Sequence, residues 1–200
     1  DGYDVVNATR PLMAFAKEFS TWYLRLSRER LRTNSESQAV FGYVLRKYCL
    51  LMAPFAPFMA ERIYQSIGGT KDSIHLEDWP TPIASFVSSE LETQMEEVMA
   101  IVEKGHAERK NAAIRLRQPL SSITVSTKLA EDLVGIITEE LNVKKLILGD
   151  SLALDTTLTP ELEAEGTARD LMRDIQGARK KLGLSPKDQV AVELPSWPES

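Results

Sequence analysis

Residues 19–32 read FSTWYLRLSRERLR, a stretch that mixes aromatic, leucine and arginine side chains at helical spacing. The apolar period begins upstream, after Pro11, and runs through Leu12, Phe15, Phe19, Trp22 and Leu26. Spacings of three and four predict one amphipathic helix over about 11–32. At about 100° per residue, Arg25, Arg28 and Arg32 fall on one stripe, roughly a third of a turn from the apolar face.

This arginine stripe has two interpretations. Three guanidinium groups in a row could each present forked donors to a phosphate oxygen. The aromatic rings of Trp22 and Tyr23 beside them could help to shape a surface for unpaired bases. The alternative is a solvated basic edge beside an ordinary core, with Trp22 in that core, and most charge runs are of this kind. The pattern alone leaves both interpretations open.

The helical pattern continues toward the C-terminus. The expected elements are helices over about 37–52, 57–67 and 88–113, with an irregular loop over 70–86. Pro57 suits a first helical position because its missing N–H would have no partner there, and Gly68-Gly69 suits a helix end. Ser89 and Glu92 have the spacing of a capping box for the long helix.

Strands and helices alternate after about residue 115. The expected elements are strands over 123–125, 143–148, 151–156 and 189–194, and helices over 129–141 and 160–182. Thr159 is the expected N-cap of the last helix, and Gly183 its expected stop. The predicted fold class is therefore mostly α with a C-terminal α+β part. A helical bundle over 1–115 precedes a small α+β module over 116–200, which is expected to be incomplete at its end.

A second basic segment lies where these two parts join. Arg109 and Lys110 end the long helix, and Arg115 and Arg117 alternate with leucine. On a strand, those two arginines would point the same way. Such a face could follow a nucleic-acid backbone, or its cations could neutralise the acidic helix over 90–103. Both interpretations remain open.

A third basic face is expected on the last helix. Its members recur at spacings of four, three and four and are Arg169, Arg173, Gln176 and Lys180. A separate apolar stripe consists of Leu171, Ile175, Ala178 and Leu182. Gly166 costs a helix about 1 kcal/mol relative to alanine, which favours close packing at that position. A core helix with a solvated basic side is the alternative interpretation.

The overall charge argues against a nucleic-acid partner. The 200 residues carry a formal net charge of −5, whereas nucleic-acid-binding domains are usually basic. Only the local concentration of arginine in the three segments favours such a partner.

The sequence has no apolar run of about 18 residues and no visible signal peptide, so no membrane association is expected. The single Cys49 fits a reducing compartment, and a cytoplasmic location is expected.

No group of residues predicts catalysis or metal binding. Gly68-Gly69 lacks the Lys and Ser/Thr that would complete a phosphate-binding loop. His75 and His106 lie far apart and have no cysteine companions, which disfavours a zinc site. No nucleophile elbow accompanies the serines. We expect no catalytic site, no metal site and no cofactor in this chain.

Six stretches carry a further signal, namely residues 19–32, 51–61, 73–80, 115–120, 140–145 and 165–176. Taken in order, they resemble isoleucyl-tRNA synthetase, a class I aminoacyl-tRNA synthetase. The second is similar also to valyl- and leucyl-tRNA synthetases, whereas the last three favour the isoleucyl branch. The signatures His-Ile-Gly-His and Lys-Met-Ser-Lys-Ser of that class are missing, and so are any editing domain and a Cys-rich zinc-binding tail.

The resemblance implies that the helical bundle binds the anticodon stem and loop of isoleucine tRNA. It implies a parent enzyme that uses ATP and magnesium and whose catalytic domain lies before Asp1. Both ends of the chain are interpreted as cuts, because the first residue is Asp1 and residues 194–198 show no structural close. A monomer is expected. The expected tRNA-binding residues are Trp22, Tyr23, Arg25, Arg28, Arg32, Arg109, Lys110, Arg115, Arg117, Arg169 and Arg173. The rival hypotheses are a structural or protein-interaction module and the equivalent part of a valyl- or leucyl-tRNA synthetase.

Overall fold

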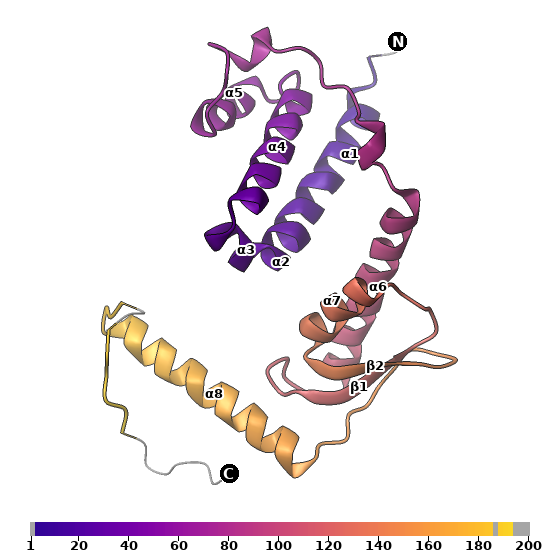
Figure 1. Cartoon of the computed structure of the whole chain (residues 1–200), viewed down its shortest axis with the longest axis vertical. Helices are drawn as coiled ribbons and strands as arrows, with labels where there is room; N and C mark the ends of the chain where they lie inside the picture. The colour runs from indigo at the N-terminus through magenta and orange to yellow at the C-terminus, as the bar shows by residue number, and fades with distance from the viewer. Residues whose placement is uncertain (1–2, 186–187, 194–200) are drawn as a thin grey trace. The chain divides into compact units, whose positions relative to one another are not determined.

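The computed structural model describes residues 3–185 and 188–193, and the chain divides into two compact units, Asp1–Ala84 and Ser85–Ser200 (Figure 1). Many helices and one small mixed sheet confirm the predicted class, mostly α with a C-terminal α+β part. The expected division at 115/116 lies just after the helix α6 (Ser89–Asn111). The compact units divide before α6 instead, because this helix packs on α7 (Glu131–Leu141) of the second unit.

The first unit contains helices and loops but no strand among its described residues. Its elements are α1 (Val5–Glu18), the π-turn η1 (Phe19–Tyr23), α2 (Leu24–Leu26), α3 (Arg28–Thr33), α4 (Ser35–Met52), α5 (Pro57–Ser66) and the 3-10 turn η2 (Ile74–Leu76), and a second 3-10 turn, η3 (Ala84–Phe86), lies at the boundary. The side chains of Asp4 and Asn34 cap α1 and α4 by accepting backbone hydrogen bonds. Pro57 opens α5 as predicted. Gly68 follows α5 with a φ of +78°, which glycine adopts without a steric penalty.

The prediction of one regular helix over 11–32 is wrong. Helix starts earlier, at Val5, and the π-turn η1 interrupts it. Ser27, with φ −92° and ψ 0°, then separates α2 from α3. The wider i→i+5 turn shifts the phase of the residues that follow it. The aromatic face therefore continues through Tyr23, which stacks on Phe19 at 5.2 Å between ring centroids, and not through Trp22.

Two groups of side chains hold the first unit together. A stack of aromatic rings joins the first helical segments to α4 and consists of Phe15, Phe19, Tyr23, Phe41 and Tyr48. A buried cluster joins α4, α5 and η2 and consists of Cys49, Leu50, Ala53, Ala60, Tyr64 and Ile74. The phenolic oxygen of Tyr64 accepts hydrogen bonds from the backbone N–H groups of Thr70 and Lys71, each at 2.9 Å. The loop after α5 is thereby fixed to the helix.

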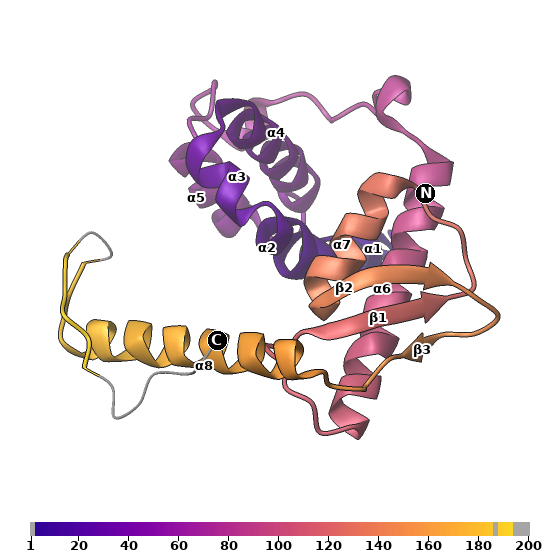
Figure 2. The ribbon, with the colours of Figure 1, turned by 60° about the horizontal axis from the view of Figure 1, so that its bottom comes forward.

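The second unit contains a three-stranded sheet in the order β2–β1–β3. The central strand β1 (Leu120–Val125) pairs in parallel with β2 (Val143–Leu148) and antiparallel with the short β3 (Ala153–Leu154). The helices α6 and α7 lie together against the sheet (Figure 2). Gly105 of α6 allows this approach, since a Cβ there would lie 2.5 Å from a methyl carbon of Leu141.

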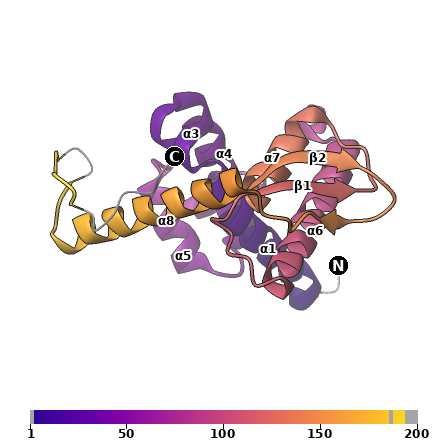
Figure 3. The same cartoon turned by 90° about the horizontal axis from the view of Figure 1, so that it is seen from below.

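The helix α8 (Pro160–Lys181) begins beside the sheet and then extends away from it (Figure 3). Thr159 caps it and Gly183, with φ +70°, follows its end, as predicted. Three other predictions need correction. The strand expected over 151–156 contains only Ala153–Leu154, the N-cap of α6 is Ser88 and not Ser89, and residues 189–193 form no strand. Leu194, the last residue of that expected strand, lies outside the described residues.

Candidate nucleic-acid interface

The first basic surface is the exposed side of α2 and α3, and we call Arg25, Arg28 and Arg32 the first arginine set. Arg28 and Arg32 are four residues apart on one face of α3, whereas the turn at Ser27 separates them from Arg25. The three arginines therefore do not form the single regular stripe that was predicted. They remain neighbours in the chain, and all three are exposed.

Each arginine of this set is held differently. Arg25 donates from Nε to the carbonyl oxygen of Thr21 at 3.0 Å, and its guanidinium lies 5.3 Å from the ring centroid of Trp22. Arg32 lies 3.4 Å from Glu29 in an ion pair whose side chains are 70% and 81% exposed. Such a pair is worth about 0–1 kcal/mol. The side chain of Arg28 has no hydrogen bond or ion pair with any residue that the structure describes.

The two aromatic residues of this segment have different surroundings. Tyr23 is half-buried within the aromatic stack. Trp22 is also half-buried but lies outside that stack, and the guanidinium of Arg25 faces its ring. Trp22 was predicted to share a core face with Phe15 and Phe19. It does not, because Tyr23 takes that place in the aromatic stack. The Trp22–Arg25 pair instead combines a ring and a cation at one place on the surface.

Arg109 is not on a surface at all, which contradicts its predicted place on a basic face. Its side chain is 2% exposed. Nη1 donates to the carbonyl oxygens of Arg115 and Gln118 at 3.0 and 2.9 Å, and Nη2 donates to that of Asn142 at 2.9 Å. Nε has no partner among the described atoms. Burial lowers the pKa of Arg109 to about 10, which still leaves the group charged at neutral pH.

Asn142 is the centre of the contacts around Arg109. It ends α7 in the left-handed conformation, with φ 49° and ψ 56°. Its Nδ2 donates to the carbonyl oxygens of Leu116 and Arg117 at 2.9 and 3.1 Å. Its Oδ1 accepts a 2.7 Å hydrogen bond from Arg169. We call this arrangement the Asn142 junction. It ties the end of α6, the segment before β1, the end of α7 and α8 to one another.

Arg115 and Arg117 lie on the outside of the Asn142 junction. Residues 115–117 form a turn and not a strand, yet both guanidinium groups reach Asp170 of α8. The distances from Nη1 to the carboxylate are 3.4 Å for Arg115 and 2.9 Å for Arg117. The hydrogen bond from Arg117 is the main cause that lowers the pKa of Asp170 below its usual value.

The remaining basic residues are distributed along this unit. Arg169 donates to Glu165 as well as to Asn142, both at 2.7 Å. Arg173 pairs with its neighbour Asp174, and Lys110 is exposed at the end of α6.

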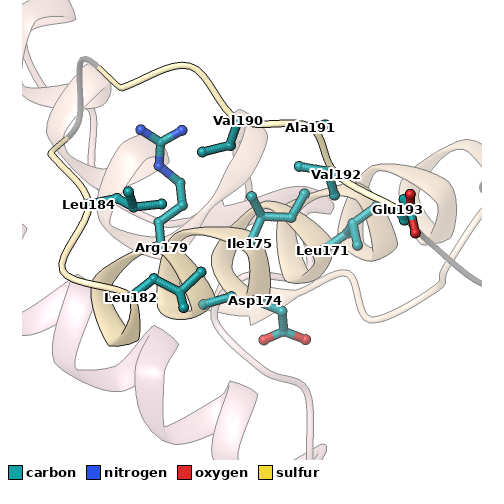
Figure 4. A pocket seen from close by; sticks show the side chains of 11 residues that line it. Leu171, Asp174, Ile175, Arg179, Leu182, Leu184, Val190, Ala191, Val192 and Glu193 are labelled. Atoms are coloured by element: carbon teal, nitrogen blue, oxygen red, sulfur yellow. The ribbon is translucent and has the colours of Figure 1, made fainter.

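The apolar stripe on α8 forms a shallow pocket of about 360 Å³, with residues 190–193 along its far side (Figure 4). Gly166 packs closely on Gln118, as predicted: a Cβ there would lie 2.1 Å from Oε1.

The first part of the chain matches a known protein family. Residues 1–125 match the family described as "Anticodon-binding domain of tRNA ligase". The chain belongs to this family. The match covers the whole first unit and continues through α6 to the end of β1.

Three relatives of the chain are isoleucine–tRNA ligases. The enzyme of Clostridium acetobutylicum is 38% identical over 96% of the chain and 20% of its own length. That of Pyrococcus furiosus is 35% identical over 95% of the chain and 20% of its own length, and one of Dehalococcoides mccartyi is 31% identical over 95% and 22%. The chain spans about a fifth of the length of the curated relatives that it matches.

Three of the stretches that carried the resemblance meet at the Asn142 junction. Residues 115–120, 140–145 and 165–176 are far apart in the sequence, and Asn142, Arg117–Asp170 and Lys144–Glu165 connect them. Neither Asn142 nor Asp170 was predicted to be part of the site. The only signal for them was their presence inside these stretches.

The described residues were also compared with the requirements of a metal site and of a membrane-spanning helix. No group of three His, Cys, Asp or Glu side chains among them is arranged to hold a metal ion. No helix in the part of the chain that the structure describes is long and apolar enough to cross a membrane.

Proposed function

We propose that this chain is the anticodon-arm-binding part of an isoleucine–tRNA ligase and that it positions isoleucine tRNA for aminoacylation by a catalytic domain outside the chain. The family match and the isoleucine–tRNA ligases among its relatives support this function. The structural observation that carries it is the exposure of five arginines in two local sets on a chain of net charge −5. Average charge would repel RNA, so binding must depend on these local sets.

The first arginine set is proposed to contact RNA phosphates. Arg28 has the most favourable position, because no described residue competes for its donors. Arg32 would give up only a weak, exposed ion pair with Glu29. Trp22 and Arg25 together offer a ring and a cation to an unstacked base or a phosphate, and Tyr23 supports the helix beneath them.

The second unit is proposed to contribute a further basic surface. Arg115 and Arg117 are its principal residues, and Lys110 and Arg173 extend it. Arg169 has a positioning role, since both ends of its guanidinium are held by Asn142 and Glu165. Arg109 supports the same surface from within, because it fixes the carbonyl oxygens of Arg115 and Gln118. Direct contact between Arg109 and RNA is not proposed.

The parent enzyme would join isoleucine to its tRNA with ATP and magnesium, which its catalytic domain would bind. That domain is then the protein partner of this chain, and the parent is proposed to act as a monomer in the cytoplasm.

Binding to isoleucine tRNA across a salt series tests the function. We expect affinity to fall steeply as salt rises, because each neutralised phosphate releases bound cations. A transcript with a changed anticodon should bind more weakly. Arg28→Ala should weaken binding by about 3- to 10-fold at low salt, the effect of losing one charged contact. Arg62→Ala is the matched control, because Arg62 is an exposed arginine of α5 outside the proposed surface.

The outcomes separate the competing functions. Equal and salt-independent affinity for both transcripts would favour the structural or protein-interaction module. Exposed apolar residues such as Phe58 and Met59, which are 90% and 66% exposed, would then be the first surface to study. Stronger binding to a valine or leucine tRNA would instead move the assignment to the related synthetases.

A further inference from the structure

Arg115 and Arg117 converge on the carboxylate of Asp170 in the second unit. The two arginines come from the turn before β1 and the carboxylate from α8. Each carboxylate oxygen contacts a different guanidinium: Oδ1 lies 2.9 Å from Arg117 and Oδ2 lies 3.4 Å from Arg115. Two cations that converge on two oxygens of one group have the geometry with which arginines also bind the two free oxygens of a phosphodiester.

This ion pair is weak, although its backbone is well fixed. The side chains of Arg115, Arg117 and Asp170 are 78%, 44% and 34% exposed, so water competes for every contact. Exposed pairs of this kind contribute little to stability. The backbone around them is held by the Asn142 junction and by the close approach of Gly166 to Gln118. These contacts hold the backbone of the two arginines independently of the carboxylate.

The donors of the two arginines are mostly unused. Each guanidinium carries five N–H donors, and Asp170 contacts Nη1 alone on each. Arg169 differs, because Asn142 and Glu165 hold both of its terminal nitrogens at 2.7 Å. Arg109 differs as well, because it is buried. Of these four arginines, only Arg115 and Arg117 have exposed side chains that pair with the same carboxylate.

We propose that Asp170 occupies, in the unbound protein, the position that an RNA phosphate takes between Arg115 and Arg117, and that RNA displaces it. This inference rests on the proposed function. The exchange replaces one anion by another, so neither arginine is left without a counter-ion at any stage. It also gives Asp170 a regulatory role, since polyanions must displace the carboxylate before they gain the two arginines.

Asp170→Asn tests the exchange, with Glu163→Gln as its matched control. Both substitutions remove one carboxylate from α8, but Glu163 is exposed and has no ion pair among the described residues. Binding of an isoleucine tRNA transcript is measured by fluorescence anisotropy at low and at moderate salt. We expect Asp170→Asn to tighten binding about 3- to 10-fold, beyond the smaller, purely long-range effect of Glu163→Gln. In a chain that already carries Arg115→Gln and Arg117→Gln, Asp170→Asn should give no more than the control does.

Each other result has a definite meaning. If Asp170→Asn matches Glu163→Gln or weakens binding while the arginine substitutions also weaken it, the exchange is wrong and the proposed function stands. If the unaltered chain shows no salt-dependent binding, the proposed function fails and the exchange fails with it. Thermal unfolding by circular dichroism verifies that each variant is folded. Asp170→Ser, which also lacks the carboxylate, replaces Asp170→Asn if the latter does not fold.

Discussion

The side-chain oxygen of Asn142 accepts a 2.7 Å hydrogen bond from Arg169, which joins the end of α7 to the middle of α8. The same side chain donates to the carbonyl oxygens of Leu116 and Arg117. One amide group thus uses both its donor nitrogen and its acceptor oxygen to hold the turn that carries the exposed arginines. The backbone that carries this basic surface is therefore held by Asn142.

Substitutions of Asn142 should separate its backbone role from its side-chain role. Asn142→Gly keeps access to the left-handed conformation and loses three hydrogen bonds, so we expect a loss of about 1.5–3 kcal/mol in the free energy of unfolding. Asn142→Ala should lose about 1 kcal/mol more, because alanine disfavours that conformation. Urea unfolding followed by circular dichroism measures both. Equal stability of the two variants would show that the backbone conformation carries no cost.

Removal of Arg109 should destabilise the protein strongly. Arg109→Met removes the three hydrogen bonds that Arg109 donates to the carbonyl oxygens of Arg115, Gln118 and Asn142, so we expect a loss of about 2–4 kcal/mol. Arg109→Lys should recover only part of this, because an ammonium lacks the planar fork that reaches three carbonyl groups. Lys110→Ala is the control and should change stability by less than about 0.5 kcal/mol. A tolerated Arg109→Met would contradict a supporting role for this residue.

Two glycines of α8 should respond to alanine with opposite signs. A Cβ at Gly166 meets Gln118, which donates a 2.6 Å hydrogen bond to the carbonyl oxygen of Leu162, whereas a Cβ at Gly177 meets nothing within 4 Å. Gly177→Ala should therefore stabilise the protein by about 0.5–1 kcal/mol through helix propensity. Gly166→Ala should destabilise it by about 1–2 kcal/mol, because the displaced Gln118 outweighs that gain. Thermal unfolding of the two variants side by side measures the contrast, and equal shifts would contradict it.

Local patterns in the sequence predicted most of the elements. The strand over 143–148 has the predicted bounds, and Thr159 and Gly183 mark the ends of α8 as expected, because caps and alternation depend on neighbouring residues. The π-turn η1 could not be predicted in this way. An apolar spacing of four fits both an α-helix and a π-turn, so the stretch 19–32 indicated a helix but not its phase.

The site was less predictable than the fold, because its contacts are distant in the sequence. Arg109 donates a hydrogen bond to the carbonyl oxygen of Asn142, which lies 33 residues away in the sequence. Arg117 donates to Asp170, which lies 53 residues away. Helical spacing shows which side chains share a face, but it does not show what another element places against them. Sequence reasoning therefore assigned Arg109 and Arg115 to one basic face, although one is buried and the other exposed.

Glu77 should make the first unit sensitive to acid through Tyr64. The hydroxyl of the buried Tyr64 donates to Glu77, and this bond is the main cause that holds the pKa of Glu77 below its usual value of 4.5. A lowered pKa in the folded state contributes stability that is present above about pH 4.5 and is lost as the pH falls through the folded-state pKa. Tyr64→Phe removes that cause, raises the pKa of Glu77 and should flatten the acid limb of stability against pH. At neutral pH it should cost about 1–3 kcal/mol, because two backbone N–H groups lose their acceptor.

Urea unfolding of the two proteins between about pH 3 and 7 measures this difference. The gap in stability between the unaltered chain and Tyr64→Phe should be largest at neutral pH and should narrow in acid, since a protonated Glu77 no longer gains from the tyrosine hydroxyl. Tyr43→Phe is the control, because the Tyr43 side chain is exposed and its hydroxyl makes no hydrogen bond with a described residue. Its curve should run parallel to that of the unaltered chain. A Tyr64→Phe curve that is also parallel would show that Glu77 does not link this loop to pH.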